Sequence, residues 1–249
     1  KNIPTIINSN QITLGQIPRY YLEFISLVSL VGFLMFWFVF HSESIRRVFH
    51  SRMEHDAACL WHIFTTKAWG FVTMAVFPAV VLQFAIGKSP VDLGLVWPTE
   101  HNALIWQWTL GLGSIVMLVA ALGARKFDPQ YPQIQARVWN GSMMALNWLG
   151  WALYLAGYEF LFRGVLLFPL VETFGEWPAV AINTVLYSAT HVPKGRDEAI
   201  GAIPLGFLLC WVTLQTESLW PAILVHILMA WTNTTARFMR HPQMKWKGQ

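Results

Sequence analysis

The chain has 249 residues, of which 55% are hydrophobic and only 12% are charged. Soluble domains are about 25% charged on a smaller apolar fraction, so the composition excludes an ordinary soluble protein. The net charge of +4 is what basic loops give a membrane protein, and we do not interpret it as a sign of nucleic-acid binding. Cys59 and Cys210 are too few for a disulfide framework and lack metal-ligand spacing.

Apolar runs follow one another along most of the chain and predict its transmembrane helices. They fall at about residues 22–40, 66–87, 104–123, 139–172, 176–190, 198–214 and 218–233. The fourth run exceeds the ~20 residues of a simple crossing, so we expect it to be tilted, extended past the bilayer or broken. Pro169 is predicted to kink or end this helix, and Gly175 and Pro178 mark the turn that follows. We therefore predict a single all-α polytopic membrane domain over residues 1–249 with about seven transmembrane helices.

The basic residues sort unequally if each run crosses the membrane once. One side receives Arg46, Arg47, Arg52, Arg125, Lys126, Arg137, Lys194, Arg196, Arg237, Arg240, Lys245 and Lys247. The other side receives Lys1, Arg19 and Lys88, while Lys67 is placed at a helix start. Positive charge favours the cytoplasmic side, so we expect an outside amino terminus and a cytoplasmic carboxyl terminus. We further expect the membrane to be a bacterial inner (plasma) membrane.

Two charged side chains lie deep in the fourth apolar run, and histidines lie at the end of the fifth run and within the seventh. Glu159 and Arg163 are spaced i, i+4, which places them on one helix face as an ion pair. Each charge costs at least ~2.5–3.5 kcal/mol in the bilayer, so such residues usually face the bundle interior. His191 and His226 lie on two other predicted helices. Taken separately, the ion pair could be a structural bridge and each histidine a hydrogen-bonded core residue.

A polar line on the fifth predicted helix strengthens the case for a shared polar interior. Asn183, Tyr187 and His191 are spaced i, i+4, i+8, and we add Asn233 of the last helix to this interior. A carboxylate and a histidine together can activate a water, and a second histidine can stabilise an oxyanion. Because no paired HExxH motif is present, we predict neither a metal nor another cofactor. His41, His50, His55 and His62 are interpreted as solvated or interfacial.

Three segments in order resemble the CPBP (CAAX protease and bacteriocin-processing, also called Abi) family of intramembrane proteases. The first family motif is E-E-x-x-x-R, and Tyr158 to Gly164 reads YEFLFRG here. The second is F-x-x-x-H, matched by Tyr187 to His191, and the third is a histidine after an S-L-W-P-like turn, matched by Ser218 to His226. Leu93-Gly94-Leu95 upstream is also similar to the family. The resemblance implies a CPBP-like helical bundle with a motif-bearing core at about residues 139–233.

The resemblance also implies roles for individual residues. In the family, the first glutamate and the second-motif histidine activate water, while the third-motif histidine and an asparagine stabilise the oxyanion. Here the first glutamate position is Tyr158, whose phenol is a poor general base at pH 7, and the asparagine position is Ala230. Glu159 projects about 100° away around an α-helix, so it could replace the base only if the helix rotates or unwinds locally.

Two hypotheses follow from this degenerate site, and the sequence does not decide between them. In the first, which we favour, the chain is a pseudoprotease that acts as a scaffold or subunit in a membrane assembly. In the second, it is an active intramembrane endopeptidase that cleaves a peptide near the cytoplasmic boundary, with Glu159, Arg163, His191 and His226 as its site. The expected partners are the lipid bilayer, on which the basic tail lies, and a membrane protein or a peptide substrate.

Overall fold

The computed structural model describes residues 20–248, and these residues are almost entirely helical. The prediction of an all-α polytopic membrane protein is confirmed, with two short strands as the exception in the described chain. Strands β1 (Val138–Trp139) and β2 (Lys245–Trp246) pair in parallel near the carboxyl end. The α-helices are α1 (Tyr21–Phe40), α2 (Glu43–Arg52), α3 (His55–Phe71), α4 (Phe77–Ile86), α5 (Asn102–Gly123), α6 (Gly141–Glu159), α7 (Phe168–Phe174), α8 (Glu176–Ala189), α9 (Arg196–Thr216) and α10 (Trp220–Arg240).

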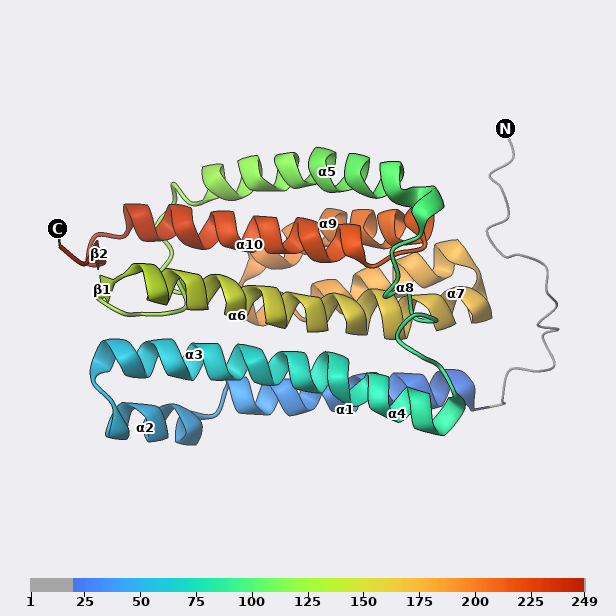
Figure 1. Cartoon of the computed structure of the whole chain (residues 1–249), viewed down its shortest axis with the longest axis horizontal. Coiled ribbons are helices and arrows are strands. Elements are labelled where there is room, and N and C mark those ends of the chain that lie inside the picture. The colour runs from blue at the N-terminus through green and yellow to red at the C-terminus, as the bar shows by residue number, and fades with distance from the viewer. Residues whose placement is uncertain (1–19, 249) are drawn as a thin grey trace.

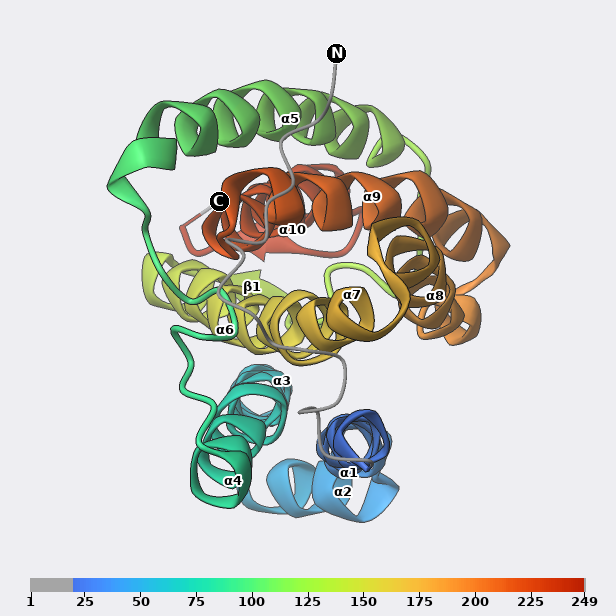
Figure 2. The same ribbon diagram turned by 90° about the vertical axis from the view of Figure 1, so that its right-hand side faces the viewer.

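The helices run roughly along one common direction and form a layered bundle (Figure 1). Seen from the end, α5 forms one edge, α9 and α10 lie next to it, α6 to α8 occupy the middle, and α1 to α4 form the opposite edge (Figure 2). The contacts agree with this order, because α10 packs against α5 and α6, and α3 packs against α6. The middle layer therefore contacts neighbours on both sides.

Five helices of the described chain are long and apolar enough to cross a membrane. They span Tyr21–Phe40, His55–Ile86, Asn102–Gly123, Gly141–Phe174 and Arg196–Thr216. The other two predicted crossings correspond to α8 and α10, which pack in the same bundle. With 14 residues, α8 reaches only about 21 Å and is shorter than a ~30 Å hydrocarbon core. α10 is long enough but more polar, since its second half carries Arg237 and Arg240.

The second predicted crossing begins earlier than its apolar run. The helix starts at His55 and continues to Ile86, so the placement of Lys67 at a helix start is wrong. Lys67 lies within α3 and is 2% exposed. Polar residues such as His62 and Thr66 lower the hydropathy of this stretch without interrupting the helix, because neither proline nor glycine occurs before Gly70.

The long fourth run forms one continuous helix from Gly141 to Phe174. A π-helical segment, η3 (Phe160–Leu167), joins α6 to α7, and Pro169 falls in the first turn of α7. The alternative that Pro169 ends the helix is therefore wrong, because the helix continues to Phe174 and ends at Gly175, where φ is +80°. The alternative that Pro169 kinks the helix stays a prediction. Pro169 directly follows the widened turns of η3, and such local adjustments accommodate the backbone N–H that proline lacks, whereas glycine readily adopts positive φ.

A second π-helical segment, η1 (Val72–Val76), joins α3 to α4 and lies against η3. Close approach of the two long helices depends on glycine. A Cβ atom on Gly157 would lie 2.9 Å from the Cα of Phe71, a contact that real side chains essentially never make. Small residues of this kind allow membrane helices to approach backbone to backbone.

The loops that follow α1 and α5 and the segment after α10 lie at the same end of the bundle, whereas the loop between α4 and α5 lies at the other end (Figure 1). The basic residues of those three segments are therefore gathered at one end. Lys1 and Arg19, which the sequence assigns to the opposite side, lie outside the described residues. Which end faces the cytoplasm stays a prediction.

Candidate functional site

Three helices and one turn bring the predicted site residues to the middle of the bundle. Tyr158 and Glu159 are the last residues of α6, Arg163 lies in η3, and His226 lies in α10. His191 follows the end of α8, immediately before a short 3₁₀ turn, η4 (Val192–Lys194). The three motifs thus lie close together, although Glu159 of the first and His226 of the third are 67 residues apart in the sequence.

Glu159 is completely buried and divides its carboxylate between two partners. Its Oε1 atom lies 2.6 Å from Nδ1 of His226, and its Oε2 atom lies 3.1 Å from Nη1 of Arg163. A carboxylate only accepts, so Nδ1 of His226 donates and its Nε2 atom is left for other partners. The predicted ion pair is present, and its carboxylate also holds the third-motif histidine.

Arg163 is fixed by more than its carboxylate partner. Its Nη2 atom donates to the carbonyl oxygen of Gly206 at 3.3 Å, and its guanidinium carbon lies 4.3 Å from the centre of the Tyr187 ring. A Cβ atom on Gly206 would come within 2.8 Å of Cδ1 of Tyr187. Glycine at this position of α9 therefore allows the tyrosine to cover the arginine.

Tyr158 occupies the position of the family's first glutamate and faces the second motif. Its hydroxyl lies 2.6 Å from Oγ1 of Thr190, which donates in turn to the carbonyl oxygen of Tyr187 at 2.7 Å. Since the threonine hydroxyl has one proton, Tyr158 is the donor in the first bond. The Tyr158 ring centre lies 6.3 Å from that of His191 and 6.0 Å from that of His226, edge-on to both. The phenol therefore sits between the two histidines.

His191 is half-buried and is held by its own helix end. Its Nδ1 atom lies 2.9 Å from the carbonyl oxygen of Tyr187, so Nδ1 donates and Nε2 has the free lone pair. Glu159 is not among its hydrogen-bond partners in the described chain; Glu159 contacts Arg163 and His226 instead. The direct carboxylate–His191 contact that would pair a base with the second motif is therefore not formed.

Three other residues singled out from the sequence, Asn183, Asn233 and Ala230, contact side chains or backbone outside the group around Glu159. Asn183 is fully buried, donates to the carbonyl oxygen of Phe162 at 2.6 Å and accepts from Cys210, so it braces η3. Asn233 is half-buried and accepts from Nε of Arg237 at 2.8 Å, and its assignment to the polar interior stays a prediction. Asn233 lies beyond His226 on α10, toward the end of the helix that carries Arg237 and Arg240. Ala230 belongs to an apolar cluster with Tyr131, Trp151 and Leu155.

The Leu93-Gly94 segment closes the bundle over η3. The carbonyl oxygen of Gly94 accepts from the backbone N–H of Leu219 at 2.9 Å, and Ser218 donates to Val96 at 2.6 Å. A Cβ atom on Gly164 would lie 2.8 Å from the carbonyl oxygen of Leu93. This loop therefore fastens the start of α10 to the helix that carries Glu159 and Arg163.

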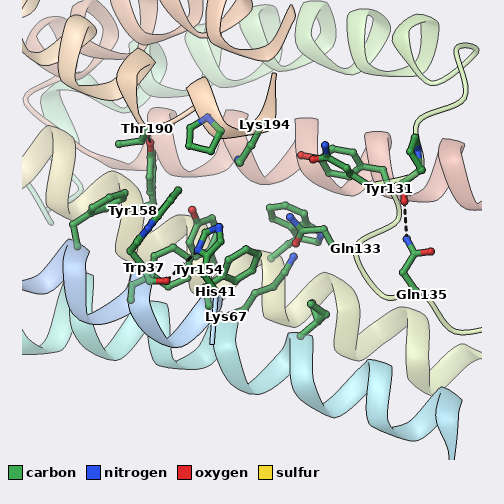
Figure 3. A pocket seen from close by; sticks show the side chains of 18 residues that line it. Trp37, His41, Lys67, Tyr131, Gln133, Gln135, Tyr154, Tyr158, Thr190 and Lys194 are labelled. Atoms are coloured by element: carbon green, nitrogen blue, oxygen red, sulfur yellow. Dashed lines mark hydrogen bonds between the residues drawn. The ribbon is translucent and has the colours of Figure 1, made fainter. Parts of the chain in front are cut away.

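A pocket of about 310 Å³ adjoins the site and has Tyr158 and Thr190 on its wall. Figure 3 shows the side chains that line it, with Lys67, His41 and Lys194 among them. Sequence reasoning missed Lys67 as a pocket residue because the helix was predicted to begin beside it. Lys67 is the one charged residue between positions 57 and 86. If the helix had been predicted to begin at His55, Lys67 would have stood out as a charge inside a membrane-spanning helix.

The arrangement restricts the chemistry. A carboxylate that fixes Nδ1 of an imidazole is the pairing by which hydrolases orient a histidine base, and Glu159 stands in that relation to His226. The position that faces His191 carries a phenol, which donates a hydrogen bond but does not readily accept a proton. Among residues 20–248 no three His, Cys, Asp or Glu side chains group as a metal site.

Comparison with known protein families gives a match to part of the chain. The model of the family described as "Type II CAAX prenyl endopeptidase Rce1-like" matches residues 138–232, which is less than half of the chain. No curated protein matches the chain. No solved structure matches it either.

Proposed function

Because the chain belongs, through residues 138–232, to the CPBP family of CAAX-protease-like membrane proteins, we propose that it is a pseudoprotease acting as a scaffold or subunit in a membrane assembly. One observation carries the proposal. The carboxylate of Glu159 has no exposed surface and is divided between Arg163 and His226. Held between these two partners, it makes no contact with His191 in the described chain and is therefore not placed to deprotonate a water molecule there.

The two substituted motif positions support the same proposal. The Tyr158 hydroxyl donates a hydrogen bond to Oγ1 of Thr190, and this bond holds the phenol against the end of α8. Ala230 contributes to apolar packing and offers no hydrogen bond to an oxyanion. Loss of one oxyanion donor typically reduces the rate by ~10²–10³. The substitution at Tyr158 affects water activation and the substitution at Ala230 affects oxyanion stabilisation, so both steps of the family's reaction are weakened.

A second candidate function is an intramembrane endopeptidase, and the 2.6 Å contact between Glu159 and His226 favours it. In this reaction Nε2 of His226 takes a proton from water, and the oxygen attacks the peptide carbonyl carbon. The C–N bond then breaks, and the proton passes from His226 to the leaving amine.

A cleavage assay distinguishes the two functions. The full chain is reconstituted in liposomes and offered prenylated carboxyl-terminal peptides and leader peptides, beside His191→Ala and His226→Ala. His50→Ala, on the exposed face of α2, is the matched control. We expect no turnover by the wild type. Turnover that is lost in His191→Ala or His226→Ala and retained in His50→Ala contradicts the pseudoprotease proposal.

The reverse experiment asks whether the site has decayed from an active one. The double variant Tyr158→Glu, Ala230→Asn restores the two motif positions, with each single variant as its control. Under the proposal, cleavage appears in the double variant and is weaker or absent in the singles. If the wild type already cleaves at the rate of the double variant, the substitutions are not what limits the chemistry.

A further inference from the structure

Lys67 is a buried basic residue whose amine has no hydrogen-bond partner in the described chain. It is 2% exposed, and its Nζ atom is among the buried polar atoms that lack one. The Nζ atom lies 2.9 Å from the centre of the Trp151 ring, so an aromatic face is its main electrostatic partner. Ionisable residues within a membrane bundle are costly and usually mark a ligand or ion site.

The wall of the pocket carries three basic side chains and no acidic one among its described residues. Lys67, Lys194 and His41 line it, and none of its described lining residues is Asp or Glu. Glu159 follows the wall residue Tyr158 in the sequence, but its carboxylate is already paired with Arg163 and His226. A cation that is buried without an anion is unfavourable, so the pocket is suited to receive one.

The rest of the wall is mainly aromatic, with a few polar amide side chains from the loop before α6. Side chains of α1 and α6 supply it, including Phe36, Phe40 and Tyr154. A second buried atom without a partner, Oε1 of Gln133, belongs to the same wall. In Figure 3, Lys67 and Gln133 both belong to the group of side chains that surrounds the cavity. A volume of about 310 Å³ lies at the small end of ligand sites, so it suits a small molecule or one end of a longer one.

The stem of Lys67 is also accommodated by its neighbours. A Cβ atom on Gly150 of α6 would lie 3.3 Å from Cδ of Lys67, which is a tight contact. The absence of a side chain at Gly150 therefore leaves room for the lysine between α3 and α6. The bundle holds the ammonium group beside Trp151 at the pocket wall.

We propose that this pocket binds a carboxylate attached to an apolar group, with Lys67 as the counterion and the aromatic wall around the apolar part. The carboxylate can come from the carboxyl terminus of a peptide or from an alkyl acid, and both have the same chemistry at Lys67. The inference goes beyond the proposed function, because it concerns a different residue and holds whether or not the centre cleaves peptides.

Binding of matched acids and amides to the full chain in nanodiscs tests the proposal by isothermal titration calorimetry. One pair is 4-phenylbutyrate and 4-phenylbutyramide, and the other is N-acetyl-leucyl-phenylalanine and its carboxyl-terminal amide. We expect the wild type to bind the acid at least about ten-fold more tightly than the amide in one or both pairs, since a charge-assisted contact is lost in the amide. The pair with the tighter acid identifies the source of the carboxylate.

Lys67→Met removes the charge at similar length, and Lys67→Gln is a second variant that keeps a polar end. Lys126→Met is the matched control, because Lys126 is exposed and lies outside the pocket. The preference for the acid should fall to about two-fold or less in both Lys67 variants and persist in the control. A wild type that does not distinguish acid from amide in either pair, or a folded Lys67 variant that still does, overturns the proposal.

Discussion

A carboxylate, a guanidinium and an imidazole that are shut away from water must satisfy one another. Glu159, Arg163 and His226 do this at the junction of α6 and η3, with none of the carboxylate exposed. Removing one member of such a group leaves an opposite charge buried without compensation, which costs more than the intact group contributes. The centre is therefore a structural requirement whatever chemistry it performs.

Glu159→Gln should destabilise the protein by about 3–5 kcal/mol, because Arg163 is then buried without its anion. Unfolding of the detergent-solubilised protein measures the effect. The double variant Glu159→Gln, Arg163→Met should recover much of the loss. Glu43→Gln removes an exposed partner of Arg46 and serves as the control, with an expected cost below about 1 kcal/mol. Equal losses in Glu159→Gln and Glu43→Gln would show that the buried pair is not important for stability.

At this scale the sequence was informative only where partners lie on one helix. The i, i+4 spacing predicts the contact of Glu159 with Arg163, and that contact is present. The contact of Glu159 with His226 spans 67 residues and depends on how α10 packs against α6, which no local pattern encodes. Lys67 was misplaced for another reason, since hydropathy locates an apolar run and not the start of a helix.

Two π-helical segments decide how the long helices present their side chains. η3 begins directly after Glu159, and η1 lies against it in the neighbouring helix. Such widened turns occur often at functional sites and have no simple residue signature, so the sequence could not predict them. Whether local unwinding lets Glu159 replace the family's base stays a prediction, because η3 begins beside Glu159 but its carboxylate contacts Arg163 and His226.

Gly164 lies within η3, where a Cβ atom would come 2.8 Å from the backbone oxygen of Leu93. Gly164→Ala should therefore destabilise the protein by about 1–3 kcal/mol, because a backbone atom cannot turn aside as a side chain can. Gly111→Ala in α5 is the control, since nothing lies within 4 Å of its Cβ position. Alanine there should be neutral or stabilise by up to about 1 kcal/mol. Thermal unfolding compares the two, and equal melting temperatures would mean that the loop yields.

The whole molecule has its basic loops at one end. Arg46, Lys126 and Arg240 represent the three segments that Figure 1 places together. Apolar runs and proline or glycine positions predicted the helical architecture and most spans. The shortness of α8 and the early start of α3 could not be predicted from them, because those features depend on packing within the bundle.

Cysteine labelling tests the orientation that this charge distribution predicts. Lys126→Cys and Val91→Cys place exposed thiols at opposite ends, whereas native Cys59 and Cys210 are buried. A membrane-impermeant maleimide should label Val91→Cys in intact cells and Lys126→Cys only after permeabilisation, because basic loops remain cytoplasmic. The wild-type chain is the control for background labelling. The reverse pattern would invert the orientation.

The widened turns also determine how related chains should be aligned. A π turn closes its hydrogen bond one residue later than an α turn, so it has the length effect of an inserted residue. Beyond η3 the helix is out of phase with α6, and one helical wheel drawn through Gly141–Phe174 assigns the wrong faces to α7. A relative without this turn should therefore need a one-residue gap in the alignment between its motif glutamate and the position of Pro169. Without that gap, every later residue of the helix would be compared with the wrong neighbour.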